Sequence, residues 1–463
     1  MSLNAKLTGT RLDVIMKMEY AWAFRNNIAT VDGWFYNLYK EHIRAINDFS
    51  ELNNKKKNFL NFLETFHFLI SEFEKGKWDS SRDKIEISND GSIRNGGHRF
   101  ALSNLYGYKF CEIVKTKKEP LDFSASFFLK RKLKKEFCFY ALERYIKHSS
   151  TCHILVLFPS RSYDINAIES KISKKFKTIF TKNIYLNSNG VHNLVLHMYR
   201  DQEWATLEKN QGYSLTLRHA QQRYTKGEPV KMVLVDNSKI EDLHKFKREI
   251  REDLKKGNFP IHVPDTHQEV LDLAGLVLRD SGTIFLNNAK PKNNKKVHNL
   301  MKMFHEWVVQ EDYDINDFCV IGSAYVSLEG HREVNDLDVI DLKFRDCPIK
   351  NINIIKRNSN WLKFYSLDKI FSPENNFNYN GIRVLSRSLI KNFKKKRATG
   401  KDLQDLNYLK SADEKSRFKR VLNYFAGVCL ESSFWILFRI RTAIPKPVKK
   451  IIRNLIGRVF KTK

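Results

Sequence analysis

The stretch from Phe318 to Phe344 reads FCVIGSAYVSLEGHREVNDLDVIDLKF, and it decides the expected fold of the carboxyl-terminal part of this chain. An apolar run leads into Gly322-Ser323, and Asp336 and Asp338 follow after twelve intervening residues. We expect a strand that ends in the Gly-Ser turn and a second strand that begins at Asp336. The two aspartates then share one face, because side chains two residues apart point to the same side of a strand.

This pattern predicts a site for a nucleotide and magnesium (Mg2+). The backbone N–H groups and the hydroxyl of a Gly-Ser turn can bind a phosphate, so Gly322 and Ser323 are the expected nucleotide-binding residues. Paired carboxylates suit magnesium, so Asp336 and Asp338 are the expected metal ligands and catalytic residues. A structural explanation stands beside this one, because Gly-Ser is a common turn and an Asp-x-Asp pair often ends a strand or caps a helix.

The joint pattern resembles a known family. Gly330 and Arg332 lie in the connecting segment, and residues 381–386 precede a Lys-rich helix. Over residues 318–409 the chain resembles the DNA polymerase β nucleotidyltransferase superfamily, including its minimal and AbiEii-like members. The resemblance implies magnesium-dependent transfer of a nucleotidyl or phosphoryl group from ATP or another nucleoside triphosphate.

The superfamily usually supplies a third carboxylate from a later strand, and this sequence does not identify it. Asp341 follows on the opposite strand parity from Asp336 and Asp338, and Asp346 and Asp368 lie in segments that cannot be aligned with the family pattern. A site with two carboxylates could bind a nucleotide without transferring any part of it.

A second phosphate site is predicted near the amino terminus. Asn95 is followed by Gly96-Gly97-His98-Arg99, which opens a predicted helix. The glycines leave backbone N–H groups open at the positive end of the helix dipole, and His98 and Arg99 add donors there. An ordinary strand-turn-helix junction with an exposed arginine is the alternative.

The segment 85–113 resembles the ParB/sulfiredoxin fold, and its Asn-Gly-Gly-His-Arg variant is similar to members associated with bacterial surface-glycan gene sets. The resemblance implies nucleotide phosphate binding at Gly96, Gly97, His98 and Arg99, with the last two as catalytic residues. Asn95 stands where many relatives have Asp, which puts direct catalysis at that position in doubt.

The middle of the chain predicts an α/β layer structure. Its short apolar runs are separated by helix-compatible stretches, and they predict strands at 153–158, 194–199, 230–235 and 283–287. His262, Asp265, His267 and Glu269 are spaced closely enough to suggest a metal site. Thr266 explains most of them more simply, because with Glu269 three residues later it predicts a capping box at a helix start.

The composition indicates a folded chain with an anionic partner. Of 463 residues, 42% are hydrophobic, and the formal net charge is +29. From residue 391 onward, 20 Lys and Arg residues accompany 5 Asp and Glu residues. Nucleic acid, an anionic membrane surface or phosphorylated substrates fit this charge.

The sequence also predicts a cytoplasmic location. The six cysteines show neither the spacing of metal ligands nor a dense disulfide framework, and the first twenty residues lack a secretory signal pattern.

The last residues predict an amphipathic helix after Pro445 and Pro447. Basic residues cover the rest of its circumference, the pattern of a helix in the headgroup layer of an anionic membrane. Its expected membrane-facing residues are Val448, Ile451, Ile452, Leu455, Ile456, Val459 and Phe460. A helix packed on the protein's own core is the alternative, and nucleic acid is a less expected partner.

Together these patterns predict an α/β and α+β multidomain fold. The expected parts are a ParB/sulfiredoxin-like module (1–120), a linker helix (121–150), an α/β middle region (151–290), a nucleotidyltransferase-like mixed-sheet domain (291–412) and a basic amphipathic tail (413–463).

The expected function is that of a bacterial enzyme of surface polysaccharide (capsule or lipopolysaccharide) biosynthesis, peripheral on the inner membrane, with a sugar or glycan acceptor. A ParB-like nucleic-acid-binding regulator or defence protein is the first alternative. A non-catalytic nucleotide-binding scaffold is the second.

Overall fold

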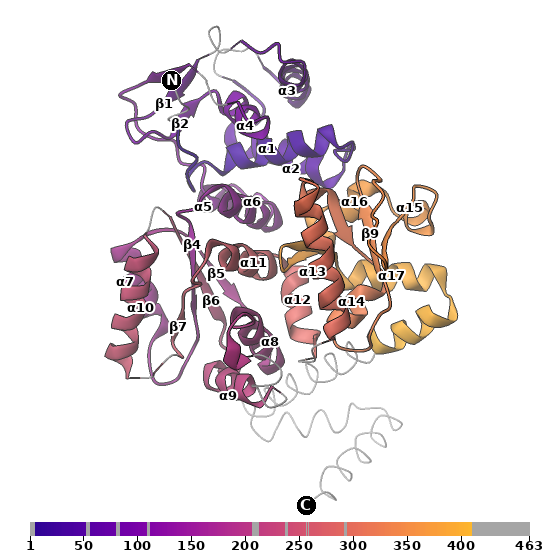
Figure 1. Ribbon diagram of the computed structural model, residues 1–463. Helices are drawn as coiled ribbons and strands as arrows, with labels where there is room; N and C mark the ends of the chain where they lie inside the picture. The colour runs from indigo at the N-terminus through magenta and orange to yellow at the C-terminus, as the bar shows by residue number, and fades with distance from the viewer. Residues whose placement is uncertain are drawn as a thin grey trace, which may run out of the picture. The chain divides into compact units, whose positions relative to one another are not determined.

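The computed structural model describes residues 5–51, 56–79, 84–108, 112–205, 213–236, 239–255, 257, 259–290 and 294–409. Within this part, helices alternate with strands that form three sheets, which confirms a mixed α/β architecture (Figure 1). The chain divides into two units after Asp402, and the described residues up to this point make up one compact unit. Each sheet lies within one of the predicted segments 1–120, 151–290 and 291–412.

The first sheet is small and carries the amino-terminal helices. The elements are α1 (Leu12–Arg25), α2 (Trp34–Asn47), α3 (Phe59–Glu74), β1 (Ile85–Ile87), β2 (Ile93–Asn95), α4 (Gly97–Leu105) and β3 (Ile113–Lys115). The strand order is β2-β1-β3, with β1 antiparallel to β2 and parallel to β3. Aromatic rings fill the core between the helices, and Tyr20 stacks on Tyr39 at 4.6 Å between ring centroids. The predicted helix after Gly96 is confirmed as α4.

The segment predicted as a linker forms α5 (Ala125–Lys130) and α6 (Lys135–His148). The basic run at 130–135 is exposed except for Leu133, as expected for a solvated face. The rest of α6 is largely buried and contacts α1 and α11, which is described below. α6 is therefore a core helix that also connects the first two sheets along the sequence.

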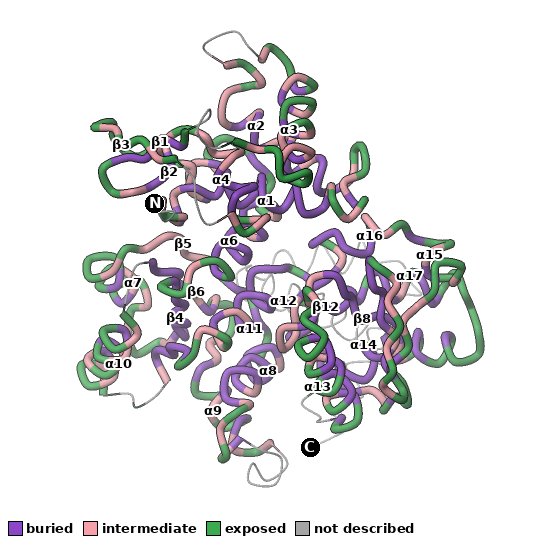
Figure 2. The backbone as a smooth tube through the Cα atoms, turned by 45° about the horizontal axis from the view of Figure 1, so that its top comes forward, coloured by how far each residue is buried: buried purple, intermediate pink, exposed green. Residues whose placement is uncertain are grey.

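The second sheet is antiparallel throughout, with strand order β5-β6-β4-β7. The elements of this segment are β4 (His153–Leu157), α7 (Ile165–Lys175), β5 (Lys177–Ile184), α8 (Ser188–Met198), η1 (Glu203–Ala205), α9 (Ser214–Arg223), β6 (Val230–Asp236), α10 (Ile240–Leu254), β7 (Ile261–His262), α11 (His267–Val277) and α12 (Asp280–Asn288). One face packs on α7 and α10 through a core that includes Leu157, Val233 and Phe246. Figure 2 shows buried strands β4 and β6 beside the exposed outer sides of these two helices.

Two of the four predicted strands in this region are confirmed, and two are wrong. Residues 194–199 lie mainly in α8, and residues 283–287 lie in α12. Short apolar runs do not distinguish a strand from a buried helix segment, and the three-to-four spacing of Val191, Leu194 and Met198 places them on one side of a helix. The capping box is confirmed: Thr266 Oγ1 accepts from the Glu269 N–H at 3.2 Å.

The third sheet has five strands in the order β10-β9-β8-β12-β11 and is mixed. The elements are α13 (Lys295–Gln310), η2 (Ile315–Asp317), β8 (Phe318–Val320), α14 (Ser323–Leu328), β9 (Leu337–Asp341), β10 (Ile352–Ile354), α15 (Asn360–Phe364), α16 (Leu367–Phe371), η3 (Pro373–Asn375), β11 (Asn376–Tyr379), β12 (Ile382–Leu385) and α17 (Arg387–Arg397). The strands predicted before the Gly-Ser turn and at the aspartate pair are confirmed as β8 and β9, and residues 381–386 contain β12.

A buried carboxylate joins the middle segments to the third sheet. Arg279 donates to both oxygens of Glu143, from Nε at 2.6 Å and from Nη2 at 2.8 Å. Arg279 also donates to the side chain of Asn376 on β11, and Asn378 donates to Glu143. These bonds connect α6, the start of α12 and β11 within the unit of residues 1–402.

No helix among the described residues combines the length and the apolar character needed to cross a bilayer. The predicted tail helix lies outside the described residues, and so do its seven expected membrane-facing residues.

Candidate functional site

The Gly-Ser turn lies directly against the aspartate strand. β8 pairs antiparallel with β9, and beyond their ladder the Ile321 N–H donates to the Asp338 carbonyl at 2.9 Å. Gly322 has φ +69° and ψ −140°, and a Cβ atom there would lie 3.0 Å from Asp338 Oδ2. Glycine is therefore needed at position 322 for both its backbone conformation and its distance from the carboxylate.

A positive charge borders the same turn. Arg332, from the segment between α14 and β9, donates from Nη2 to Ser323 Oγ at 3.0 Å. Gly330 has φ +77° and starts this segment directly after α14. The four residues predicted from the sequence thus lie close together: Gly322 and Ser323 form the turn between β8 and α14, Asp336 directly precedes β9, and Asp338 lies on β9.

Asn353 joins the aspartate pair, and sequence reasoning missed it. β10 runs parallel to β9, with Asn353 in register with Asp338. The Asn353 amide Nδ2 lies 3.3 Å from Asp336 Oδ2 and 3.3 Å from Asp338 Oδ1. One amide therefore donates to both carboxylates. Only the register of β10 on β9 brings Asn353 to the pair, and no local sequence motif predicts that register.

Two of the three later aspartates considered from the sequence lie away from the pair. Asp341 points to the other face of β9, where it is fully buried and binds Arg345. Asp368, on α16, lies against Gly33, which precedes α2. Within the described part of the chain, no group of three His, Cys, Asp or Glu residues could hold a metal ion.

The charge around Asp338 comes from several elements. Burial raises the pKa of Asp338, and the neighbouring charge of Asp336 adds to this, while the Asn353 hydrogen bond opposes it. Arg397 and Lys394 at the end of α17 also lower this pKa, so their positive charges act on Asp338. Asp402 fixes both of them: its carboxylate is 2.7 Å from Arg397 Nε and 3.3 Å from Lys394 Nζ.

This donor set fits magnesium. Two carboxylates supply hard oxygen ligands, and magnesium in nucleotide sites is commonly bound by one or two carboxylates together with substrate phosphates. The Asn353 amide occupies the position from which a cation could contact both carboxylates, and an amide can also offer its oxygen to a metal. Arg332 at the turn adds positive charge beside the pair, and Lys394 and Arg397 add charge that Asp402 partly balances.

Replacing Asn353 with aspartate is expected to turn the pair into a three-carboxylate metal site. We expect Asn353→Asp to bind Mn2+, used as a probe for magnesium, at least about tenfold more tightly than the wild type, because each added charge strengthens cation binding at short range. Calorimetric titration of the full-length chain measures this. Asn351→Asp adds the same charge just before β10 and serves as the control, and equal gains in both variants would contradict the assignment.

The second predicted site lies at the start of α4. Gly96 has φ +82°, and its N–H donates to Asn95 Oδ1 at 2.7 Å. A Cβ atom at Gly96 would lie 3.2 Å from Arg99 Nη2, so this guanidinium folds back over the helix start. The N–H groups of the first helical turn have no partner within the helix and can bind an anion.

Basic residues of α1 also lie at this helix start. A Cβ atom at Gly97 would be 3.2 Å from Lys17 Nζ and 3.4 Å from both Arg11 Nη2 and Asp13 Oδ2. Asp13 accepts from Arg11 Nε at 2.8 Å and from Lys17 Nζ at 2.6 Å, and all three side chains are buried. Arg11 Nη1 is buried without a hydrogen-bond partner in the described part of the chain. The net charge at this glycine turn is positive, because three cations, Arg11, Lys17 and Arg99, accompany one carboxylate, Asp13.

His98 packs among aromatic side chains next to this positive group. Its Nε2 is 2.9 Å from the Tyr39 hydroxyl, and its ring meets the Phe66 ring edge-on at 4.6 Å. Burial and the nearby charges of Lys17 and Lys56 lower the pKa of His98 well below its ordinary value. The imidazole is neutral, so the positive charge of the site comes from Arg11 and Lys17, which sequence reasoning did not include, and from Arg99.

Comparison of this chain with protein-family models, with curated proteins and with solved structures found no match.

Proposed function

We propose that this chain binds a nucleoside triphosphate with magnesium at the Gly322–Asp338 site and transfers a nucleotidyl or phosphoryl group to an acceptor. The observation that carries the proposal is the contact between the glycine turn and the Asp338 carboxylate. A phosphate held by the turn would lie beside the metal ligands, which is the arrangement that phosphoryl and nucleotidyl transfer require.

Each residue has a role in this proposal. Asp336 and Asp338 would hold magnesium, which when bound neutralises phosphate charge. The turn at Gly322 and Ser323 would bind the phosphates through N–H groups and the hydroxyl, while Arg332 orients that hydroxyl through its 3.0 Å bond. Lys394 and Arg397 would attract the triphosphate. Catalysis of this kind depends mainly on positioning and charge stabilisation.

The α4 site is proposed as a second nucleotide phosphate site. Its support is the group of Arg11, Lys17 and Arg99 around Gly96 and Gly97, together with the resemblance of this segment to the ParB/sulfiredoxin fold.

For the acceptor we propose a sugar or a membrane-linked glycan, in surface polysaccharide biosynthesis on the inner face of the bacterial membrane. This part rests on the sequence resemblance and on the basic, amphipathic tail sequence. Nucleic acid is the competing partner, because a net charge of +29 also suits a polyanion.

Turnover of nucleoside triphosphates with magnesium tests the proposal. We expect Asp336→Ala/Asp338→Ala to reduce turnover about a hundredfold or more, because it removes charge stabilisation at the reacting group. Glu333→Ala, an exposed acidic position in the connecting segment, is the control and should retain activity.

Arg99→Ala separates the two sites in the same assay. A loss confined to Arg99→Ala would move the reaction to the amino-terminal module. Unchanged turnover in both the Asp336→Ala/Asp338→Ala variant and the Arg99→Ala variant would show that both site assignments are wrong.

A further inference from the structure

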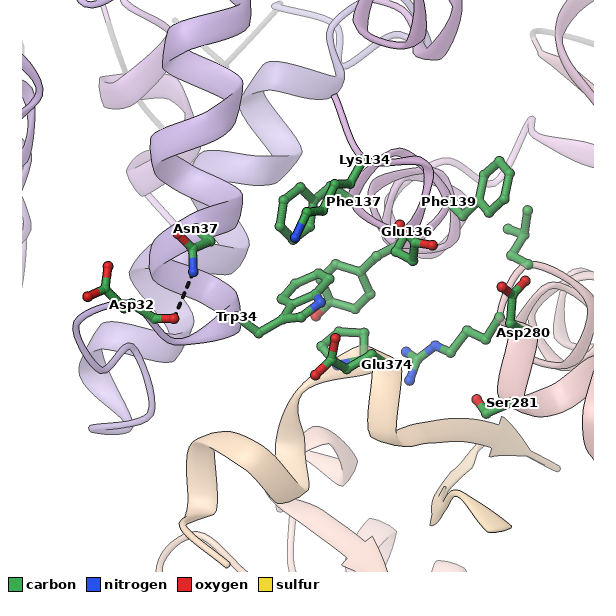
Figure 3. Close-up of a pocket in the computed structure, with 14 residues that line it drawn as sticks. Asp32, Trp34, Asn37, Lys134, Glu136, Phe137, Phe139, Asp280, Ser281 and Glu374 are labelled. Carbon is green, nitrogen blue, oxygen red and sulfur yellow. Dashed lines mark hydrogen bonds between the residues drawn. The ribbon is translucent and has the colours of Figure 1, made fainter. Parts of the chain in front are cut away.

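A cavity of about 690 Å³ lies between α2, α6, α12 and η3, and it shares no lining residue with either candidate phosphate site (Figure 3). Its volume is in the range of small-molecule sites. Because its walls come from four separate parts of the sequence, a ligand there would contact all of them.

The cavity is acidic, although the chain as a whole is strongly basic. Asp32, Glu136 and Glu374 line it, and across the described residues none of these three carboxylates has a Lys, Arg or His nitrogen within 4.0 Å. Figure 3 shows that they come from different elements: the turn before α2, α6 and η3. A fourth carboxylate, Asp280, lies 3.5 Å from Lys135.

The two cations of the lining do not balance these charges. Arg279 is already engaged by both oxygens of Glu143. Lys134 is exposed, and its Nζ lies 5.9 Å from the centre of the Phe137 ring. The cavity therefore offers unpaired negative charge at its edge.

Aromatic rings form a large part of the wall. The Trp34 ring meets Phe137 edge-on at 4.9 Å and Tyr140 edge-on at 5.1 Å, so the three rings hold one another in place. Phe139 adds a fourth ring. Arg279 lies over the Tyr140 ring at 5.5 Å and Lys182 over the Phe139 ring at 4.4 Å, so these two rings offer a ligand mainly their remaining apolar surface, which packs against alkyl chains.

These properties exclude most ligand classes. An anion would be repelled by the carboxylates. A purely apolar ligand would remove water from charged groups without forming hydrogen bonds to them in place of the water. A single metal ion is a poor occupant, since the carboxylates come from separate elements and the described residues hold no metal-binding group of three.

We infer that this cavity binds a linear polyamine of the spermidine class. Separate ammonium groups along a flexible alkyl chain can reach carboxylates on different elements while the chain lies against Trp34 and Tyr140. The inference does not depend on the proposed transfer reaction.

Calorimetric titration of the full-length chain with spermidine tests this inference. We expect saturable binding that weakens about threefold in Glu374→Gln and in Glu136→Gln and about tenfold in the double variant, because each change removes one charge pair. Glu241→Gln, an exposed acidic position on α10 outside the cavity, should bind within about twofold of the wild type. Circular dichroism checks that the variants are folded.

A neutral diol of similar length provides the second comparison and should show no saturable binding. Absence of saturable spermidine binding would overturn the inference. Equal affinity in the wild type and the double variant would also overturn it, because the binding would then not depend on these carboxylates.

Discussion

Asp338→Asn is expected to make the folded chain more stable at neutral pH, by about 0.5–1 kcal/mol, whereas the same substitution at Asp341 destabilises it. Burial and the charge of Asp336 raise the pKa of Asp338, so its charged form is disfavoured in the folded state. Asparagine removes that charge and keeps the side-chain shape. Residues placed for ligand binding often reduce stability in this way.

Asp341→Asn should cost about 3 kcal/mol, because it leaves a partly buried cation without its main partner. Arg345 Nη2 lies 2.6 Å from Asp341 Oδ1, and the backbone N–H groups of Lys343 and Arg345 also donate to this carboxylate. Asp317, 3.0 Å from Arg345, retains part of the interaction and limits the loss.

Urea unfolding of the full-length variants measures both effects. The direction of the pH dependence follows from the raised pKa of Asp338. The wild type loses stability as pH rises above the ordinary aspartate pKa of 3.8 and through the raised pKa. The advantage of Asp338→Asn should therefore be complete at neutral pH and disappear in acid. A destabilised Asp338→Asn variant at neutral pH would show that Asp338 has a structural role instead.

Local signals explain what could be predicted of the fold. The Gly-Ser turn, the strands on either side of its connecting segment and the Thr266 capping box all depend on residues that are close in sequence. The structure confirms each of them. The apolar run at 194–199 failed because such a run suits either a strand or a buried helix, and contact with the rest of the fold decides between them.

The candidate sites show the same limit. Gly322, Ser323, Asp336 and Asp338 could be found because they lie in one short motif. Asn353 could not, because it meets the pair only through the register of β9 and β10.

At the amino-terminal site, Arg11 and Lys17 are separated from Gly97 by about eighty residues of sequence and meet it only in the folded chain. The motif located the helix start, but it did not contain most of the positive charge around it.

Asp13→Asn is expected to destabilise the fold strongly, by about 3 kcal/mol or more, because it leaves Arg11 and Lys17 buried without a counterion. Burial alone would raise the pKa of Asp13, but these two cations lower it far below its ordinary value. A depressed aspartate pKa means stability that is present above the ordinary value and lost as pH falls through the depressed one. The deficit of the variant is therefore complete at neutral pH.

Pyrophosphate should restore much of this loss if the helix start at Gly96 and Gly97 is a phosphate site. A ligand that binds only the folded state adds stability that grows with its concentration, and removal of the competing Asp13 carboxylate should strengthen anion binding there. Glu19→Gln is the matched control, since Glu19 is also buried and pairs with Arg144 at 2.6 Å on the same helix α1, but it is not among the groups that surround Gly96 and Gly97. In urea unfolding, increasing concentrations of pyrophosphate should raise the unfolding midpoint of Asp13→Asn more than that of Glu19→Gln. Equal rescue of both variants would reduce the effect to general screening of a basic protein and remove the support for phosphate at α4.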